Sequence, residues 1–352
     1  MIDLTRGNIL QADAEALVNT VNCVGVMGKG IALQFKNAFP DNFKAYERAC
    51  RNDEVRLGQM FIVPTNRMVN PKYIINFPTK QHWKGKSDLK DIKVGLEALV
   101  HEFKRLGITS IAIPPLGCGN GGLEWSEVAP LIRAAFGNVP DVHVLLFEPQ
   151  GAPVAEAMPI ATNKPQLTRA RALMIRLIEQ YAIPGYRLSL LEVQKLAYFL
   201  QHAGERLRLK FVRHKYGPYA DNLNHLLQRM EGHYIRGYGD RSRQPEIFLL
   251  PNAAEPANAY LAHDSEASAH LQRVSHLIAG FESPYGMELL ATVHWVVQED
   301  PGIGSDIEAL SIKVHTWSSR KQQLFRVDHI RKAWRRLHDQ SWLKETSLKS
   351  RQ

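Results

Sequence analysis

Two glycine-rich segments constrain the first half of this chain more than any other feature. Each lies between an apolar run of strand length and a helical pattern, the first at residues 19–32 (NTVNCVGVMGKGIA) and the second at residues 114–125 (PPLGCGNGGLEW). Glycines at such turns allow backbone N–H groups to converge on an anion, and the following helix adds the positive end of its dipole. One segment alone is better explained as a tight strand–helix turn. Two that face each other can hold a diphosphate from both sides.

The rest of the first half alternates between strand and helix patterns. Apolar runs of strand length occur at residues 16–20, 60–64, 73–77, 110–113 and 142–147. Helical spacing is clearest at residues 88–106 and 125–136. Buried strands that alternate with covering helices predict an α/β sandwich, in which helices cover both faces of the sheet.

The second half of the chain has a different character. Four prolines and little periodicity at residues 149–165 predict a linker at 151–166 between a first domain at 1–150 and a second at 167–352. The second domain is predicted to be mainly α-helical, with strands only at 210–214 and 246–250. Its expected helices are at residues 167–182, 188–204, 222–230, 267–281, 287–298 and 327–339.

The composition argues against several classes of protein. The longest apolar runs are far too short to cross a bilayer and no export signal precedes the first strand, so we expect a cytoplasmic protein without a membrane partner. The three cysteines, Cys23, Cys50 and Cys118, lack C-x-x-C spacing, which argues against disulfides and against a structural zinc site. Neither glycine-rich segment matches a P-loop or a dinucleotide fingerprint, so we expect no metal and no cofactor.

Four short motifs, in order along residues 1–150, resemble the macrodomain family: GNI at 7–9, VNTVN at 18–22, GKGIA at 28–32 and PLGCG at 115–119. The resemblance implies a mixed β-sheet sandwiched between helices, with ADP-ribose held between the two glycine-rich loops and its diphosphate at residues 28–31 and 117–122. The ADP-ribose-binding residues that it implies are Asn8, Ile9, Asn22, Gly28, Lys29, Gly30, Ile31, Thr79, Leu116, Gly117, Cys118, Gly119, Asn120 and Gly121.

One further segment, NFPTKQHW at residues 76–83, is similar to the DarG-type branch, which removes ADP-ribose from DNA bases with a catalytic lysine. The resemblance implies that Lys80 is the catalytic residue, that Asn22 binds the distal ribose, and that the substrate is ADP-ribosylated single-stranded DNA, with thymine favoured over guanine. Lys80 can act as an amine nucleophile or, when protonated, as an acid; a nearby diphosphate favours the charged form and hence the acid. His82 and Trp83 either stack on a base or pack at the edge of the domain.

Two positions depart from family patterns. Asn8 stands where many macrodomains have an Asp that recognises adenine; its carbonyl can still accept a hydrogen bond, so binding is expected to weaken rather than fail. Gly121 stands where the lysine-dependent branch that acts on protein esters has an Asp, which argues against a covalent lysine adduct and a glutamate ester substrate. Two alternatives remain open, a module that only binds ADP-ribose and a hydrolase of ADP-ribosylated protein.

The second domain resembles the SocA-like (Panacea) domain of antitoxins at residues 188–200 and at the YGPY motif of residues 216–219. This resemblance implies that it binds a DarT-like ADP-ribosyltransferase toxin. Leu190, Leu191, Val193 and Leu196 are expected in the core, and residues 216–219 in a turn.

Residues 231–308 carry 4 Lys+Arg against 12 Asp+Glu, whereas residues 309–352 carry 11 against 3. One hypothesis is that acids of the first block imitate a nucleic-acid backbone in the groove of the toxin. The candidate side chains are Glu282, Glu288, Glu299 and Asp300. The alternative is that these charges lie on helix faces that neutralise one another.

Overall fold

The computed structural model describes residues 1–137, 139, 141–149, 158–183, 185–239 and 245–343. The chain forms two compact units: Met1–Lys164 with Gly237–Pro245, and Pro165–Arg236 with Glu246–Gln352. The segment Gly237–Pro245, which the sequence analysis placed in the second domain, groups with the first unit. Among the described residues, no helix is both long and apolar enough to cross a membrane.

The first unit contains a six-stranded sheet in the order β1-β6-β5-β2-β4-β3. Its strands are β1 (Ile2–Thr5), β2 (Ala16–Asn22), β3 (Phe61–Pro64), β4 (Tyr73–Lys80), β5 (Ser110–Ile113) and β6 (His143–Phe147). Strand β3 pairs antiparallel with β4, while the other pairs are parallel. The sheet is therefore mixed, as predicted. Strand β4 extends three residues beyond the predicted end, so Lys80 is its last residue.

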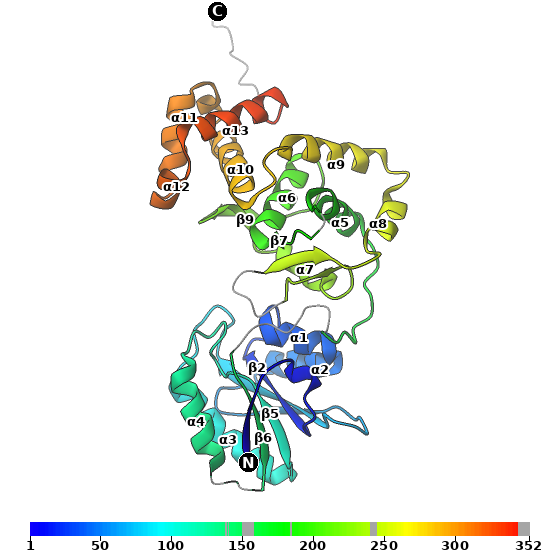
Figure 1. The fold of residues 1–352 in the computed structure, drawn as a ribbon, viewed down its shortest axis with the longest axis vertical. Helices are drawn as coiled ribbons and strands as arrows, with labels where there is room; N and C mark the ends of the chain where they lie inside the picture. Colours follow the sequence, from blue (N-terminus) through cyan, green and yellow to red (C-terminus); the bar gives the residue numbers. More distant parts are fainter. Residues whose placement is uncertain (138, 140, 150–157, 184, 240–244, 344–352) are drawn as a thin grey trace, which may run out of the picture. The chain divides into compact units, whose positions relative to one another are not determined.

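Helices cover both faces of this sheet, which confirms the predicted sandwich. They are α1 (Gly30–Ala38), α2 (Pro40–Arg51), α3 (Leu89–Leu106) and α4 (Trp125–Gly137). Alternate strand residues point to opposite faces: Ala16 and Val18 of β2 pack in the cluster that includes residues of α3 and α4, whereas Leu17 packs with residues of α1. Figure 1 shows α3 and α4 on one side of the strands and α1 and α2 on the other.

Part of the predicted linker packs on the first unit instead of spanning free between two domains. Met158 is buried in the cluster that contains Ile9 and Phe35, and the backbone N–H of Ala161 donates to the carbonyl of Asn37. A large apolar side chain gains more by entering this core than by remaining in water. Residues 151–157 of the predicted linker lie outside the described residues.

The second unit is mainly helical, as predicted. Its helices are α5 (Arg169–Tyr181), α6 (Leu190–His202), α7 (Leu223–Met230), α8 (Ala254–Leu261), α9 (Ser265–Ile278), α10 (Pro284–Glu299), α11 (Ile307–His315), α12 (Ser319–Leu324) and α13 (Val327–Asp339). Short strands β7 (Leu188–Ser189), β10 (Ile235–Arg236) and β11 (Glu246–Leu249) form one sheet, and β8 (Phe211–His214) pairs with β9 (Gly217–Ala220).

Two local predictions for this unit were wrong. Residues 217–219 of the YGPY motif belong to strand β9, and only Tyr216 lies in the turn, because a two-residue connection is enough to close the hairpin with β8. Leu190 and Leu191 are half-buried, while Val193 and Leu196 are fully buried as expected. The first two residues of helix α6 lie at its end, where fewer neighbours surround them.

Glu288, expected among the acids that imitate DNA, is instead 1% exposed. Its carboxylate pairs with Lys321 Nζ at 2.6 Å and with the Arg320 guanidinium at 2.6 and 3.1 Å. A buried carboxylate needs such partners to offset its lost hydration. It is therefore neutralised within the unit and cannot present charge to another molecule.

Candidate active site

The side chain of Lys80 lies where three segments meet at the carboxyl edge of the sheet. Its Nζ donates to the backbone carbonyls of Trp83 (3.1 Å), Gly85 (3.3 Å) and Asn120 (3.1 Å). The first two acceptors belong to the loop after β4, and Asn120 belongs to the second glycine-rich loop. Lys80 thus ties these two loops together, and three acceptors match the three N–H groups of an ammonium ion.

Burial lowers the pKa of the Lys80 ammonium from its ordinary value. Desolvation is the cause, because a charged group loses hydration when it is partly enclosed. The three carbonyl acceptors keep the proton on the nitrogen, while the lowered pKa makes that proton easier to transfer. The site therefore holds a partly buried ammonium whose three N–H groups all have backbone acceptors.

Asn22 ends strand β2 and pairs with Lys80 across a β-bulge between Val21 and Asn22, so the two residues are neighbours in the sheet. The Asn22 side chain shapes the first glycine-rich loop: its Nδ2 donates to the Val26 carbonyl at 2.6 Å, and its Oδ1 accepts from the Val24 N–H at 3.0 Å. The buried Tyr46 hydroxyl donates to the Asn22 carbonyl at 2.6 Å. Sequence reasoning did not identify Tyr46, which is remote in sequence and has no motif.

The two glycine-rich loops approach each other at Gly30 and Asn120. A Cβ added at Gly30, whose φ is +59°, would lie 3.3 Å from Asn120 Nδ2. Because α1 begins at Gly30, its first turn faces the second loop at close range. The two loops therefore approach within contact distance at Gly30 and Asn120, and the binding of a diphosphate between them stays a prediction.

Both loops offer unused backbone donors. Among the residues that the structure describes, the N–H groups of Gly119, Asn120 and Gly121 donate no hydrogen bond. The N-cap residue of α1 is Lys29, whose side chain has no acceptor, so it cannot cap the first N–H groups of that helix. Donors of this kind bind phosphate oxygens, and the dipole of α1 adds to the attraction.

Gly121 is packed so tightly that no side chain fits there. A Cβ at this position would lie 2.3 Å from Ser87 Oγ and 2.4 Å from the carbonyl oxygen of Gly117. The Ser87 N–H donates to the Gly121 carbonyl at 3.0 Å, and Ser87 itself is buried. The glycine that departs from the ester-processing pattern is thus fixed by packing. Ser87, which the sequence analysis missed, holds this loop from behind.

His82, Trp83 and Lys84 lie in an exposed loop immediately after Lys80. The His82 and Trp83 ring centroids are 5.5 Å apart, and Lys84 Nζ lies 4.8 Å from the Trp83 centroid. Trp83 is 39% exposed. An exposed aromatic ring flanked by lysines is an arrangement that can stack on a base and contact phosphate. The backbone carbonyl of Trp83 also accepts a hydrogen bond from Lys80.

Several predicted ligand residues have side chains that are engaged or buried in this structure. Ile9 and Leu116 are fully buried, so only their backbones are available. The Thr79 hydroxyl donates to the Val21 carbonyl at 3.4 Å. Asn8 Oδ1 accepts from the Leu10 N–H at 3.1 Å and, as a carbonyl oxygen, retains a second lone pair for adenine.

Cys118 is not poised as a nucleophile. Burial raises the pKa of its thiol to about 11, so it remains protonated at neutral pH. Nor do the described residues contain any cluster of three His, Cys, Asp or Glu side chains placed to bind a metal ion. Among the titratable groups described at this edge, Lys80 is the one whose side chain joins the two loops and whose pKa is lowered by burial.

Comparison with known proteins gives concordant matches. The macro domain model matches residues 18–132. A DNA ADP-ribosyl glycohydrolase of Thermus aquaticus is 47% identical over 91% of this chain and 89% of its own length. Another from Mycobacterium tuberculosis is 42% identical over 94% of this chain and 97% of its own. A DNA ADP-ribosyl transferase–DNA ADP-ribosyl glycohydrolase fusion protein of Thermosipho africanus is 36% identical over 37% of this chain and 38% of its own.

Proposed function

Because the chain belongs to the DNA ADP-ribosyl glycohydrolase family, we propose that it hydrolyses the glycosidic bond between ADP-ribose and thymine in single-stranded DNA, with Lys80 as the catalytic residue. The main support is the position of Lys80 Nζ, within 3.1–3.3 Å of three backbone carbonyls at the junction of the two loops. Free N–H groups of the second loop and the start of α1 bind the diphosphate. This places the glycosidic bond beside the lysine.

In this mechanism Lys80 acts as the general acid. The bond from the anomeric carbon to the base nitrogen breaks through an oxocarbenium-like transition state. The Lys80 ammonium exchanges one of its three carbonyl acceptors for the base nitrogen and donates that proton to the departing base. Water then adds to the anomeric carbon and releases a proton, which restores the ammonium. Asn22 supports the distal ribose, and Trp83 with His82 stacks on the flipped or neighbouring base.

The test is single-turnover release of ADP-ribose from a thymidine-modified oligonucleotide by wild type, Lys80→Ala and Lys80→Arg. We expect both variants to bind free ADP-ribose and to lose activity by about 100-fold or more. Arginine keeps the charge but cannot give up a proton, so activity in Lys80→Arg would reduce the role of Lys80 to electrostatic stabilisation. Lys93→Ala, which removes an exposed lysine of α3 that has no part in the site, serves as the control and should remain active.

The alternatives have distinct outcomes in the same assay. A module that only binds ADP-ribose would bind the oligonucleotide without release in wild type. A hydrolase of ADP-ribosylated protein would release ADP-ribose from a glutamate-linked peptide and not from DNA. The packing at Gly121 favours the DNA substrate, since the side chain that the ester-processing branch uses has no room at this position.

We further propose that the chain is an antitoxin whose second unit binds a DarT-type ADP-ribosyltransferase. The relatives from Thermus aquaticus and Mycobacterium tuberculosis align through this unit as well as the first. The Thermosipho africanus relative carries transferase and glycohydrolase names on one polypeptide, which links the two activities. The exposed acid Glu299, together with Glu282 and Asp300, remains a candidate contact to the basic groove of the toxin, whereas Glu288 does not.

This second proposal is tested by calorimetric binding of the cognate transferase to the full chain. Charge reversal at Glu282 and Glu299 is expected to weaken the complex, while Lys80→Ala leaves it intact. Unchanged affinity after charge reversal would show that these acids do not imitate DNA. Absence of any complex with the wild-type chain would contradict the antitoxin proposal itself.

A further inference from the structure

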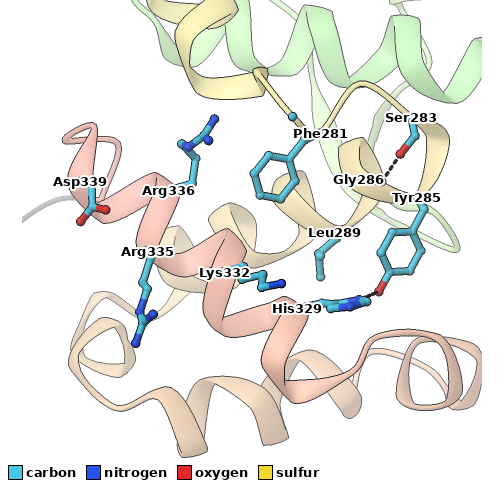
Figure 2. Close-up of a pocket in the computed structure, with 11 residues that line it drawn as sticks. Phe281, Ser283, Tyr285, Gly286, Leu289, His329, Lys332, Arg335, Arg336 and Asp339 are labelled. Atoms are coloured by element: carbon cyan, nitrogen blue, oxygen red, sulfur yellow. Dashed lines mark hydrogen bonds between the residues drawn. The ribbon is translucent and has the colours of Figure 1, made fainter.

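A pocket of about 530 Å³ lies between helices α10 and α13 of the second unit, far along the chain from Lys80. Figure 2 shows that one wall is a face of α13 and that the other is the segment leading into α10. The α13 side chains that line it are His329, Lys332, Arg335, Arg336 and Asp339. The volume lies within the range of about 300–1,000 Å³ that is usual for ligand sites.

The sequence of α13 produces this basic wall. Ile330, Ala333 and Leu337 are buried in the unit, and the basic residues recur three and four positions apart on the face beside them. Three Lys or Arg side chains, one histidine and one acid of α13 line the pocket. The α13 wall is therefore positive, whereas the opposite wall, at residues 280–289, belongs to the acidic block at residues 231–308.

Two of these cations are not neutralised by the protein. Within the described part of the chain, Lys332 and Arg335 form no hydrogen bond and no ion pair, and both are exposed. Asp339, the one acid of the lining, contacts His338 Nδ1 at 3.4 Å rather than either cation. Lys332 and Arg335 are thus available to an anion.

Several contacts join α13 to the opposite side of the pocket, at the end of α9 and the start of α10. Arg336 Nη1 donates to the carbonyls of Leu277 (3.0 Å) and Ala279 (2.5 Å) at the end of α9, and its guanidinium lies 5.4 Å from the centroid of Phe281. The Tyr285 hydroxyl is 2.7 Å from His329 Nδ1. In Figure 2 the rings of Phe281 and Tyr285 flank the pocket opposite α13. Aromatic rings beside exposed cations are suited to a base with its phosphate.

We propose that this pocket, together with Lys332 and Arg335, binds a nucleotide unit of single-stranded DNA, with the phosphodiester at the two cations and the base against Phe281 or Tyr285. An acidic peptide would satisfy the cations but would leave the aromatic wall unused. The choice of DNA rests on the proposed function.

The test uses a fluorescein-labelled, unmodified oligothymidine and the full chain, with free ADP-ribose in excess so that the first unit is occupied. Anisotropy is measured over a range of salt concentrations for wild type, Lys332→Gln, Arg335→Gln and Arg331→Gln. Arg331 is the matched control, because it is an exposed arginine of the same helix that does not line the pocket.

We expect Lys332→Gln and Arg335→Gln each to weaken binding by about tenfold, as for loss of a charged hydrogen bond. Each should also reduce the slope of log K against log salt by about 0.7, the value for one phosphate contact on a single strand. Arg331→Gln should leave both the affinity and the salt slope close to the wild-type values. Unchanged thermal unfolding of the variants confirms that they are folded.

Equal losses in all three variants, or no salt-dependent binding by wild type, would overturn the proposal. Tighter binding of an oligoglutamate of equal charge would assign the pocket to an acidic protein segment instead. Displacement by deoxythymidine monophosphate at matched nucleotide concentration would assign it to a free nucleotide. Release of ADP-ribose from ADP-ribosyl thymidine should be the same in wild type and Lys332→Gln, so failure of the proposed enzymatic function is seen separately.

Discussion

Replacing Gly121 by alanine tests whether the second glycine-rich loop is as tightly packed as the structure indicates. The new Cβ would lie 2.4 Å from the Gly117 carbonyl oxygen and 2.3 Å from Ser87 Oγ. Cβ contacts below 3.0 Å are essentially not observed, so the loop has to open by about 0.6 Å or more. The Gly117 carbonyl also accepts from the Leu123 N–H at 3.1 Å, a bond that closes the loop.

The expected cost follows from these contacts. Overpacking costs about 1–3 kcal/mol, and a weakened loop hydrogen bond adds about 1 kcal/mol. We therefore expect a loss of about 2–4 kcal/mol in the unfolding free energy of the first unit. Since 1 kcal/mol corresponds to about 2–4 °C in a domain of this size, Tm should fall by about 4–16 °C. Affinity for ADP-ribose should fall by at least about tenfold, because the free N–H groups of the loop move.

The measurement is thermal unfolding of the full chain, followed by calorimetric titration with ADP-ribose. Gly119→Ala is the stability control, since a Cβ at this position meets nothing within 4 Å. If Gly121→Ala unfolds at the wild-type temperature and binds ADP-ribose normally, the loop adapts readily to a side chain. Tight packing would then not be the reason why an Asp is missing from that position.

Three further predictions concern other sites. Glu288→Gln leaves Lys321 buried without its counter-ion and should lower the unfolding free energy of the second unit by about 3–5 kcal/mol in urea denaturation. A loss below about 1 kcal/mol, which is typical of exposed ion pairs, would mean that water reaches this pair. Burial lowers the pKa of Lys195 to about 7 from 10.5, so the unfolded state binds more protons between these values and stability should rise with pH across that window. Lys195→Met should lose this rise, and an unchanged pH profile would exclude Lys195 as its source. Trp83→Ala should slow release of ADP-ribose from an oligonucleotide more than from ADP-ribosyl thymidine if the ring stacks on a neighbouring base; equal effects on both substrates would argue for a packing role.

The sequence was sufficient to predict features that depend on local pattern. Strand-length apolar runs and glycine spacing predicted the sheet and the two loops, because each is set by residues close together in the chain. Lys80 and the ADP-ribose site came from family resemblance, and their roles stay predictions. Asn22 and Lys80 could not be paired from sequence, since their contact depends on the register between β2 and β4.

Features that depend on distant partners were missed or misjudged. Met158 looked like linker sequence, but its environment is a core built from residues near the N-terminus and α1. Glu288 looked like a surface acid in an acidic block, and only the fold brings Lys321 and Arg320 to it. Ser87 gave no signal, because a serine next to an N-cap aspartate is common and its contact with Gly121 is tertiary.

In the mechanism that we propose, the charge state of Lys80 links the packing of the second loop to the class of bond that is broken. A base leaves through nitrogen and needs a proton, whereas a glutamate ester leaves as a stable carboxylate and does not. Three carbonyl acceptors hold Lys80 as an ammonium, and burial lowers its pKa so that the proton can be given up. One of these acceptors, Asn120, stands next to Gly121, whose missing side chain lets the loop close on Ser87. A side chain at position 121 would open this loop, because its Cβ would lie 2.4 Å from the Gly117 carbonyl oxygen, and would displace the neighbouring Asn120 carbonyl that accepts from Lys80. Gly121 therefore keeps one acceptor of Lys80 in place, which supports the acid role that we propose for this lysine.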